Sequence, residues 1–431
     1  MSNFVYSKLS KITWISLQNN KIIDNFLSLI FIQATNILIP IIIIPYILQK
    51  VGLEKYGIVS YALSIYSYII LFVDYGFSLS ATKIIAINHD NKVILSKVFS
   101  EVMVTKLLLF IASYLFLLIC CITINKLQEN FILYIIGGSY VLGNMLLPTW
   151  FFQGVEKMKY VSYPNAVGKI LQLLLIYILI KKPDDYIYII GIFGITTIAT
   201  GMFSISLAYN KFYLDFKWPS KKNIFDQLHE GFDFFLPNLS ISIVNSTTII
   251  ILGLFVSNKA LGYYSIAEKI IFGIWTILGV FSQAIYPNAC RLARKGFLNL
   301  KIFLFFTCFP FIILIGVSSV LIYVYAERII NLIAGAPEYS TIHLLKIMSI
   351  IPLIVSLNIP AYLILLAYNL KNIYAKIFNY TAIFNLLQGV IIIKYLGIDG
   401  AAINMISTQF FITVSLYIAV VKKSNDLNIL T

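Results

Sequence analysis

The stretch LLLFIASYLFLLI, Leu107–Ile119, carries no charged side chain, and the stretch ILIPIIIIPYIL, Ile37–Leu48, is equally apolar. A helix needs about 20 mostly apolar residues to cross the hydrocarbon core of a membrane, and both runs lie within apolar segments of that length. Membrane β-barrels would instead show segments of about ten residues that alternate apolar and polar side chains. Both stretches therefore predict membrane-spanning helices.

The composition of the whole chain supports the same interpretation. Of its 431 residues, 60% are hydrophobic and 12% are charged, and the mean hydropathy is +0.89. A soluble chain has about 45–50% apolar and about 25% charged residues. This chain has too little charged surface for a soluble body, which excludes a soluble enzyme, a secreted disulfide-rich domain and a disordered chain.

About twelve segments are long and apolar enough to span a membrane, so the sequence predicts an all-α polytopic membrane protein. The predicted spans are residues 26–49, 56–80, 98–122, 131–153, 161–181, 186–208, 232–256, 261–288, 300–325, 342–368, 374–394 and 398–421. Several contain proline, for example Pro45 and Pro237, which either act as hinges or reflect the ordinary frequency of proline in membrane helices.

The basic residues in the loops predict the orientation. If the N-terminus is cytoplasmic, 20 lysines and arginines lie in cytoplasmic segments and 9 in outside loops, as the positive-inside rule favours. Both termini are then cytoplasmic, in agreement with an even number of spans. The predicted parts are a cytoplasmic segment 1–25, a six-helix bundle 26–208, a cytoplasmic linker 209–231, a second six-helix bundle 232–421 and a cytoplasmic tail 422–431.

Two short matches indicate an internal repeat. Gly57–Ala62 (GIVSYA) resembles Gly262–Ala267 (GYYSIA), 205 residues later, and Gly191–Gly194 (GIFG) resembles Gly397–Gly400 (GIDG), 206 residues later. Both pairs fall at equivalent spans of the two halves. With six spans per half, the two bundles have the same orientation in the membrane and are expected to surround a central cavity.

The net charge of +14 does not indicate nucleic-acid binding, because the basic residues are dispersed between apolar runs. The four cysteines and three histidines lack the spacing of metal or redox sites, so no metal and no cofactor is expected. Catalytic and nucleotide-binding motifs are missing from the sequence. The sequence therefore predicts a protein that is not an enzyme.

Three lysines lie well inside predicted spans, namely Lys106, Lys169 and Lys269. Charged groups at such depth are costly, which makes each a candidate for function. Snorkelling of the long side chain toward the membrane surface is the alternative. Lys169 is the strongest candidate, because Asn165 and Gln172 lie four residues before it and three after it and share its helix face.

Amide and carboxyl groups complete the candidate site. Gln33 and Asn36 share one face of the first span, and Asn238 and Asn245 share one face of the seventh. These faces either line a hydrated cavity or form hydrogen bonds between helices. Two carboxyl groups, Asp74 and Glu268, are candidates for proton coupling, with a position at the membrane boundary as the alternative.

Several motifs together resemble the Wzx-type O-antigen flippases, in the polysaccharide-transporter branch of the exporter superfamily that includes the multidrug (MATE) transporters. The segments that carry the resemblance are Gln33–Asn36 with Pro40 and Pro45–Tyr46, Val51–Gly57 (VGLEKYG), Phe72–Phe77 (FVDYGF) and Gly262–Lys269 (GYYSIAEK). The length and the pattern of spans match over the whole chain.

The resemblance implies a flippase that moves undecaprenyl-pyrophosphate-linked oligosaccharide to the outer leaflet of the bacterial inner membrane. It implies that the substrate cavity is lined mainly by the first, second, seventh and eighth spans, and that cations in it meet the diphosphate. Expected partners are the lipid-linked oligosaccharide and membrane lipids, with contacts to other polysaccharide assembly proteins left open.

Two alternatives remain at this stage. A cation-coupled multidrug exporter would share the fold, but such proteins commonly place an acidic residue in the first span, and residues 26–49 contain none. A membrane polysaccharide polymerase is disfavoured, because the longest outside connection, about 326–341, is short.

Overall fold

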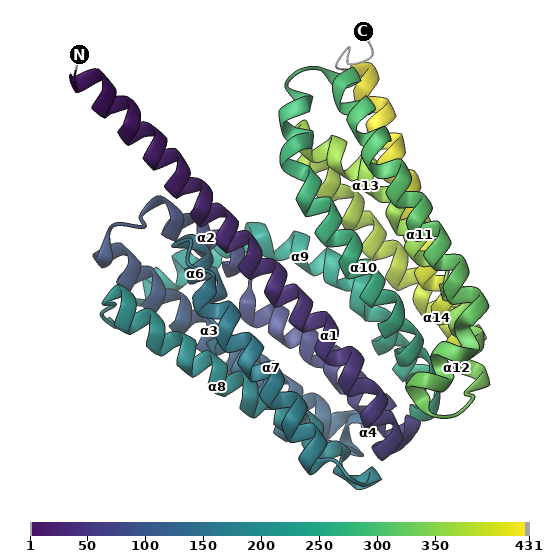
Figure 1. The fold of residues 1–431 in the computed structure, drawn as a ribbon. Coiled ribbons are helices and arrows are strands. Elements are labelled where there is room, and N and C mark those ends of the chain that lie inside the picture. Colours follow the sequence, from purple (N-terminus) through teal and green to yellow (C-terminus); the bar gives the residue numbers. More distant parts are fainter. Residues whose placement is uncertain (1, 427–431) are drawn as a thin grey trace. The chain divides into compact units, whose positions relative to one another are not determined.

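The computed structural model describes the backbone of residues 2–426 and the side chains of residue 31, residues 34–36 and residues 38–423. This part of the chain is helical and contains no strand (Figure 1). The helices are α1 (Ser2–Asp74), α2 (Phe77–Ile87), α3 (Lys92–Thr123), α4 (Asn125–Gln128), α5 (Phe131–Leu146), α6 (Thr149–Gly154), α7 (Lys159–Leu179), the short η1 (Pro183–Asp185), α8 (Tyr186–Phe212), α9 (Lys221–Phe255), α10 (Asn258–Ala293), α11 (Phe297–Ala334), α12 (Tyr339–Met348), α13 (Ile351–Ala367) and α14 (Lys371–Asp426).

The described residues contain ten helical segments that are long and apolar enough to cross a membrane. Two of them, Ala34–Ile87 and Lys371–Lys423, have 54 and 53 residues, which is enough for two crossings each. The long helices α1 and α14 in these segments each contain one internal glycine with non-helical dihedral angles, Gly52 and Gly397, where the helix bends. With two crossings in each of these two segments, the described residues allow twelve crossings, and the prediction of an all-α polytopic membrane protein is confirmed.

The structure changes some predicted boundaries. The second span, predicted to end at residue 80, breaks at Tyr75 and Gly76, whose φ angles are 40° and 83°. A side chain at Gly76 would place Cβ 2.6 Å from the Gly231 carbonyl oxygen, so close packing as well as the left-handed backbone favours glycine there. In the segment 209–231, α8 continues to Phe212 and α9 begins at Lys221, which leaves residues 213–220 non-helical.

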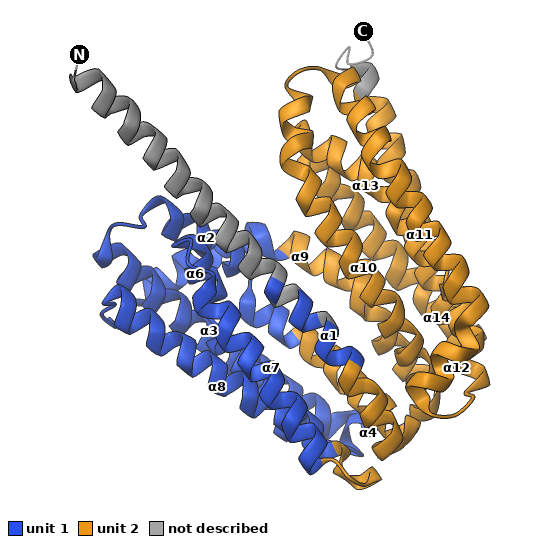
Figure 2. Cartoon of the chain, in the orientation of Figure 1, with its two compact units in different colours: residues 1–41, 69–179, 187–235 blue, residues 42–68, 180–186, 236–431 orange. Residues whose placement is uncertain are grey.

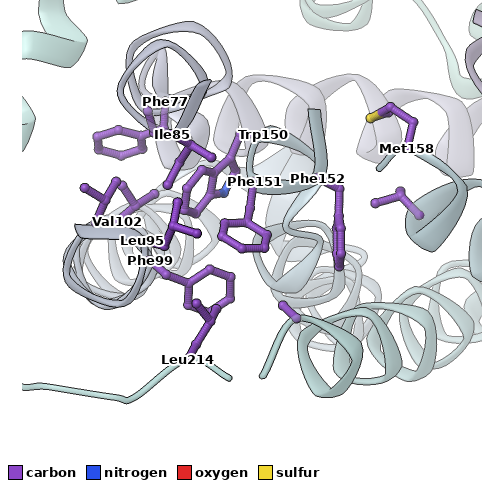
Figure 3. Close-up of a cluster of buried hydrophobic side chains, with 14 residues drawn as sticks. Phe77, Ile85, Leu95, Phe99, Val102, Trp150, Phe151, Phe152, Met158 and Leu214 are labelled. Carbon is purple, nitrogen blue, oxygen red and sulfur yellow. The ribbon is translucent and has the colours of Figure 1, made fainter. Parts of the chain in front are cut away.

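The chain divides into two compact units (Figure 2). Unit 1 contains residues 1–41, 69–179 and 187–235, and unit 2 contains residues 42–68, 180–186 and 236–431. Unit 1 has an aromatic core where α2, α3 and α6 meet, built around Phe77, Phe99, Trp150 and Phe151 (Figure 3). The rings of Phe99 and Phe151 pack edge to face, with centroids 5.2 Å apart.

The connection between α8 and α9 is held against α3 within unit 1. The backbone N–H groups of Asp215 and Lys217 donate to the Ser96 and Ser100 hydroxyls at 3.0 and 3.2 Å. Glu101, which is buried, accepts hydrogen bonds from the Asn223 and Gln227 amides of α9. The bonds to Ser96 and Ser100 satisfy backbone donors of the non-helical segment, and the bonds to Glu101 hold the first turns of α9 against α3.

In unit 2, α13 packs against α10, α11 and α14. The second part of α1 packs against the start of α10 through Gly57 and Gly262. A Cβ at Gly57 would collide with the Asn258 carbonyl, and a Cβ at Gly262 would collide with the Leu53 carbonyl. Asn258 lies 205 residues after Leu53, and Gly262 lies 205 residues after Gly57. The two repeat-related segments therefore make the same contact with each other in both directions, as expected across a two-fold axis.

Candidate functional site

Lys169 lies in a polar pocket of unit 1 with a volume of about 370 Å³. Asn165, Lys169 and Gln172 face it together from α7, as their spacing predicts. The remaining lining residues come from α1, α5 and α8: Asn36, Tyr140, Asn144, Leu147, Thr196, Thr197 and Thr200, with Gly168 of α7. The structure thus brings two predicted site residues, Asn36 and Lys169, to one pocket.

The pocket contains one charged side chain and no carboxylate among its described lining residues. Lys169 is half-buried and forms neither an ion pair nor a hydrogen bond with any described residue. The hydroxyls of Thr196 and Thr197 donate to backbone carbonyls of α8 at 2.8 and 2.6 Å, which leaves their lone pairs available. This arrangement suits an anionic, hydroxyl-bearing ligand, because the ammonium group lacks a counter-ion and amides surround it.

Lys106 lies elsewhere in unit 1. Its Nζ is 2.7 Å from Asp74 Oδ1, and its side chain is 2% exposed while that of Asp74 is 46% exposed. Neither residue lines the Lys169 pocket. The structure therefore pairs two residues that the sequence analysis treated separately, one as a cavity cation and one as a candidate for proton coupling.

Glu268 and Lys269 are neighbours on α10 in unit 2 but have different surroundings. Glu268 is 3% exposed, and its carboxyl group lies near the side chains of Tyr264 and Tyr56. It has no salt bridge within 4.0 Å among the described residues, whereas Lys269 is exposed. The carboxyl group of Glu268 is thus enclosed within unit 2.

A second pocket, of about 250 Å³, lies within unit 2 between α9, α10, α13 and α14. Asn245 lines it, together with the aromatic side chains of Trp275, Tyr362 and Tyr374. Asn238 is half-buried and does not line this pocket, and the side chain of Gln33 lies outside the described residues. Serine hydroxyls of the second span donate hydrogen bonds within their own helix. The Ser64 hydroxyl, for example, donates to the Ser60 carbonyl oxygen at 3.0 Å.

Asn245 is the one predicted site residue among the described residues that line the unit 2 pocket. Asn358 and Tyr362 are spaced i, i+4 on α13, and Trp275 and Ser282 are spaced i, i+7 on α10, so helical spacing could have found both faces. The described residues contain no group of three or more His, Cys, Asp or Glu side chains that could hold a metal ion.

Comparison with known proteins identifies the family. The model of a family described as polysaccharide biosynthesis proteins matches residues 22–292, more than half of the chain. The chain belongs to the polysaccharide biosynthesis protein family.

Two relatives support this assignment. A protein of Escherichia coli K12 named "Putative O-antigen transporter" is 27% identical over 395 residues, which are 90% of this chain and 94% of that protein. A protein of Shigella dysenteriae with the same name is 27% identical over 402 residues, 92% of this chain and 99% of its own. The resemblance found in the sequence is thereby confirmed.

Solved structures share the fold of the chain. The lipid II flippase MurJ in an inward closed conformation has a TM-score of 0.73 at 12% identity, over 92% of this chain and 87% of MurJ. An inward-facing multidrug resistance MATE transporter of the MOP superfamily has a TM-score of 0.66 at 14% identity, over 92% of this chain and 95% of that protein. At these identities the likeness establishes the transporter fold alone.

Proposed function

We propose that this protein is a flippase for undecaprenyl-pyrophosphate-linked oligosaccharide repeat units of O-antigen or a similar surface polysaccharide. It moves them from the cytoplasmic to the outer leaflet of the bacterial inner membrane by alternating access, and it is a transporter, not an enzyme. Membership of the polysaccharide biosynthesis family and the names of its relatives support the class of cargo.

The observation that carries the proposal is Lys169, which has no counter-ion among the described residues and lies in a pocket of amides and hydroxyls. A diphosphate head group brings the missing negative charge, and a charge-assisted hydrogen bond to it contributes about 1.5–3 kcal/mol. Asn36, Asn144 and Gln172 replace water around the sugar hydroxyls, since an unpaired polar group in hydrocarbon costs several kcal/mol.

The other candidates receive secondary roles in the proposal. Lys269, exposed on α10, and Asn238 and Asn245 on α9 contact the head group in other conformations. Lys106 acts through its ion pair with Asp74, which fixes the end of the second span beside α3. Membrane lipids surround the polyprenyl tail.

The proposed topology follows the distribution of basic loop residues. Two six-helix bundles, residues 26–208 and 232–421, are joined by the cytoplasmic linker 209–231, and the terminal segments 1–25 and 422–431 are both cytoplasmic. Reporter fusions test this orientation. Alkaline phosphatase is expected to be inactive when fused after residue 423 and active when fused after Lys126, and the reverse pattern contradicts the proposed orientation.

Deletion of the gene in its native strain tests the function. Surface glycan is expected to disappear while unpolymerised lipid-linked units accumulate in the cytoplasmic leaflet, and a plasmid copy is expected to restore export. Single repeat units at the surface of the deletion strain would indicate a polymerase instead. Unchanged glycan together with new drug sensitivity would indicate a multidrug exporter.

A further inference from the structure

The pocket of unit 2 differs chemically from the Lys169 pocket of unit 1. Among its sixteen lining residues none is charged, and four carry amide side chains. The amides are Asn245, Gln283, Asn358 and Gln409. A pocket that binds an anion or a cation is expected to contain a charge of the opposite sign, so this composition favours a neutral polar ligand.

Aromatic rings form another part of the wall. Trp275 stacks on Phe272, with ring centroids 5.2 Å apart and an interplanar angle of 14°. Tyr374 lies between Tyr362 and Phe378, at 5.4 and 4.7 Å. Rings held by neighbouring rings present rigid apolar surface together with a polar edge. A sugar ring has the matching character, because its C–H groups lie on the ring faces and its hydroxyls at the rim.

One amide in the wall has an unmet hydrogen-bonding capacity. Asn358 Oδ1 is buried and has no hydrogen-bond partner among the described residues. Buried acceptors without a donor are uncommon and costly in native proteins, so this atom points to a ligand that donates a hydrogen bond. A sugar hydroxyl is such a donor.

We propose that this pocket binds one sugar ring of the transported glycan, a role that rests on the flippase function proposed above. The uncharged, aromatic pocket of unit 2 thus suits a neutral sugar, whereas the Lys169 pocket of unit 1 suits the diphosphate. The volume of about 250 Å³ lies just below the range of about 300–1,000 Å³ typical of small-molecule sites, which fits one ring and not a whole repeat unit.

The test measures binding of two lipids to the full chain in nanodiscs. One is the lipid-linked repeat unit extracted from the deletion strain, and the other is undecaprenyl pyrophosphate, which has no sugar. Asn358→Leu and Tyr362→Phe are each expected to weaken binding of the repeat unit about 3–10-fold, the effect of one lost hydrogen bond, and to leave undecaprenyl pyrophosphate binding unchanged. Lys169→Gln is expected to weaken the binding of both lipids by the same factor.

Asn299→Leu, the same substitution at an exposed position of α11, is the matched control and is expected to change neither affinity. Unchanged binding of undecaprenyl pyrophosphate also shows that a variant is folded. The sugar site is overturned if the Asn358 and Tyr362 variants bind the repeat unit as tightly as the parent does, or if they bind both lipids more weakly by the same factor. Either result leaves the flippase proposal intact. Failure of the unsubstituted chain to bind either lipid contradicts the flippase proposal itself.

Discussion

Lys169 differs from Lys106, the other intramembrane lysine identified in unit 1, because it has no counter-ion among the described residues. We expect Lys169→Gln to reduce export of lipid-linked repeat units about 10-fold or more, because a neutral amide loses a charge-assisted hydrogen bond to the diphosphate. Lys169→Arg retains the charge and is expected to keep most of the export. Surface glycan in the complemented deletion strain is the measurement.

Lys371→Gln, at an exposed position at the start of α14, serves as the control for loss of one positive charge. Full export by Lys169→Gln, at normal protein abundance, would remove Lys169 from the substrate site.

The Lys106–Asp74 ion pair has a different expected role, in stability. Asp74→Asn leaves a lysine that is 2% exposed without its counter-ion. Breaking a fully buried pair costs about 3–5 kcal/mol, and the cost here is expected to be lower because Asp74 is half exposed. We expect a lower melting temperature for Asp74→Asn in detergent, and partial recovery in the double variant Asp74→Asn, Lys106→Met, which removes both charges. A double variant less stable than Asp74→Asn would argue against this account.

At the scale of helices, the contact of Gly57 with Gly262 joins two equivalent parts of the repeat within unit 2. A Cβ at Gly57 would lie 2.8 Å from the backbone nitrogen of Gly262 and closer still to the Asn258 carbonyl oxygen. Backbone atoms cannot rotate away, so Gly57→Ala is expected to destabilise the protein by about 1–3 kcal/mol through overpacking. Thermal unfolding followed by size-exclusion chromatography measures the loss.

The control is Gly273→Ala, on the partner helix α10, where an added Cβ meets no atom within 4 Å. This variant is expected to match the parent or exceed its stability slightly, because alanine favours the helix over glycine. Equal melting temperatures of Gly57→Ala and Gly273→Ala would show that the helices can separate at no cost.

The spans could be predicted from the sequence because apolar length is a local property, and Leu107–Ile119 needs no neighbour to be recognised. The match of Gly57–Ala62 with Gly262–Ala267 corresponds to a contact in the structure, because Gly57 and Gly262 pack against each other. The two glycines of the Gly191 match occupy different backbone positions, because Gly191 lies inside α8 whereas Gly397 marks a bend in α14. The Lys106–Asp74 pair could not be predicted, since it depends on how two helices lie against each other.

At the scale of the whole molecule, the question is what drives an anionic head group across the membrane without a nucleotide-binding motif. A membrane potential negative inside favours outward movement of an anion by about 2.3 kcal/mol per charge per 100 mV. Glu268 points to the proton gradient as a second driving force, because it is buried and has no salt bridge among the described residues. A group that takes up and releases a proton on alternate faces would couple transport to the proton gradient.

The two sources can be separated in proteoliposomes that contain a fluorescent lipid-linked oligosaccharide. We expect valinomycin with potassium, which collapses the potential, to slow transfer by the parent and by Glu268→Gln alike, because the charge on the cargo is unchanged. Nigericin, which collapses the pH gradient, is expected to slow the parent but not Glu268→Gln if this carboxyl carries the proton. Glu268→Asp, which retains an ionisable group, is the matched control. Full transfer by Glu268→Gln at the parent's rate, with both still sensitive to nigericin, would place proton coupling at another residue.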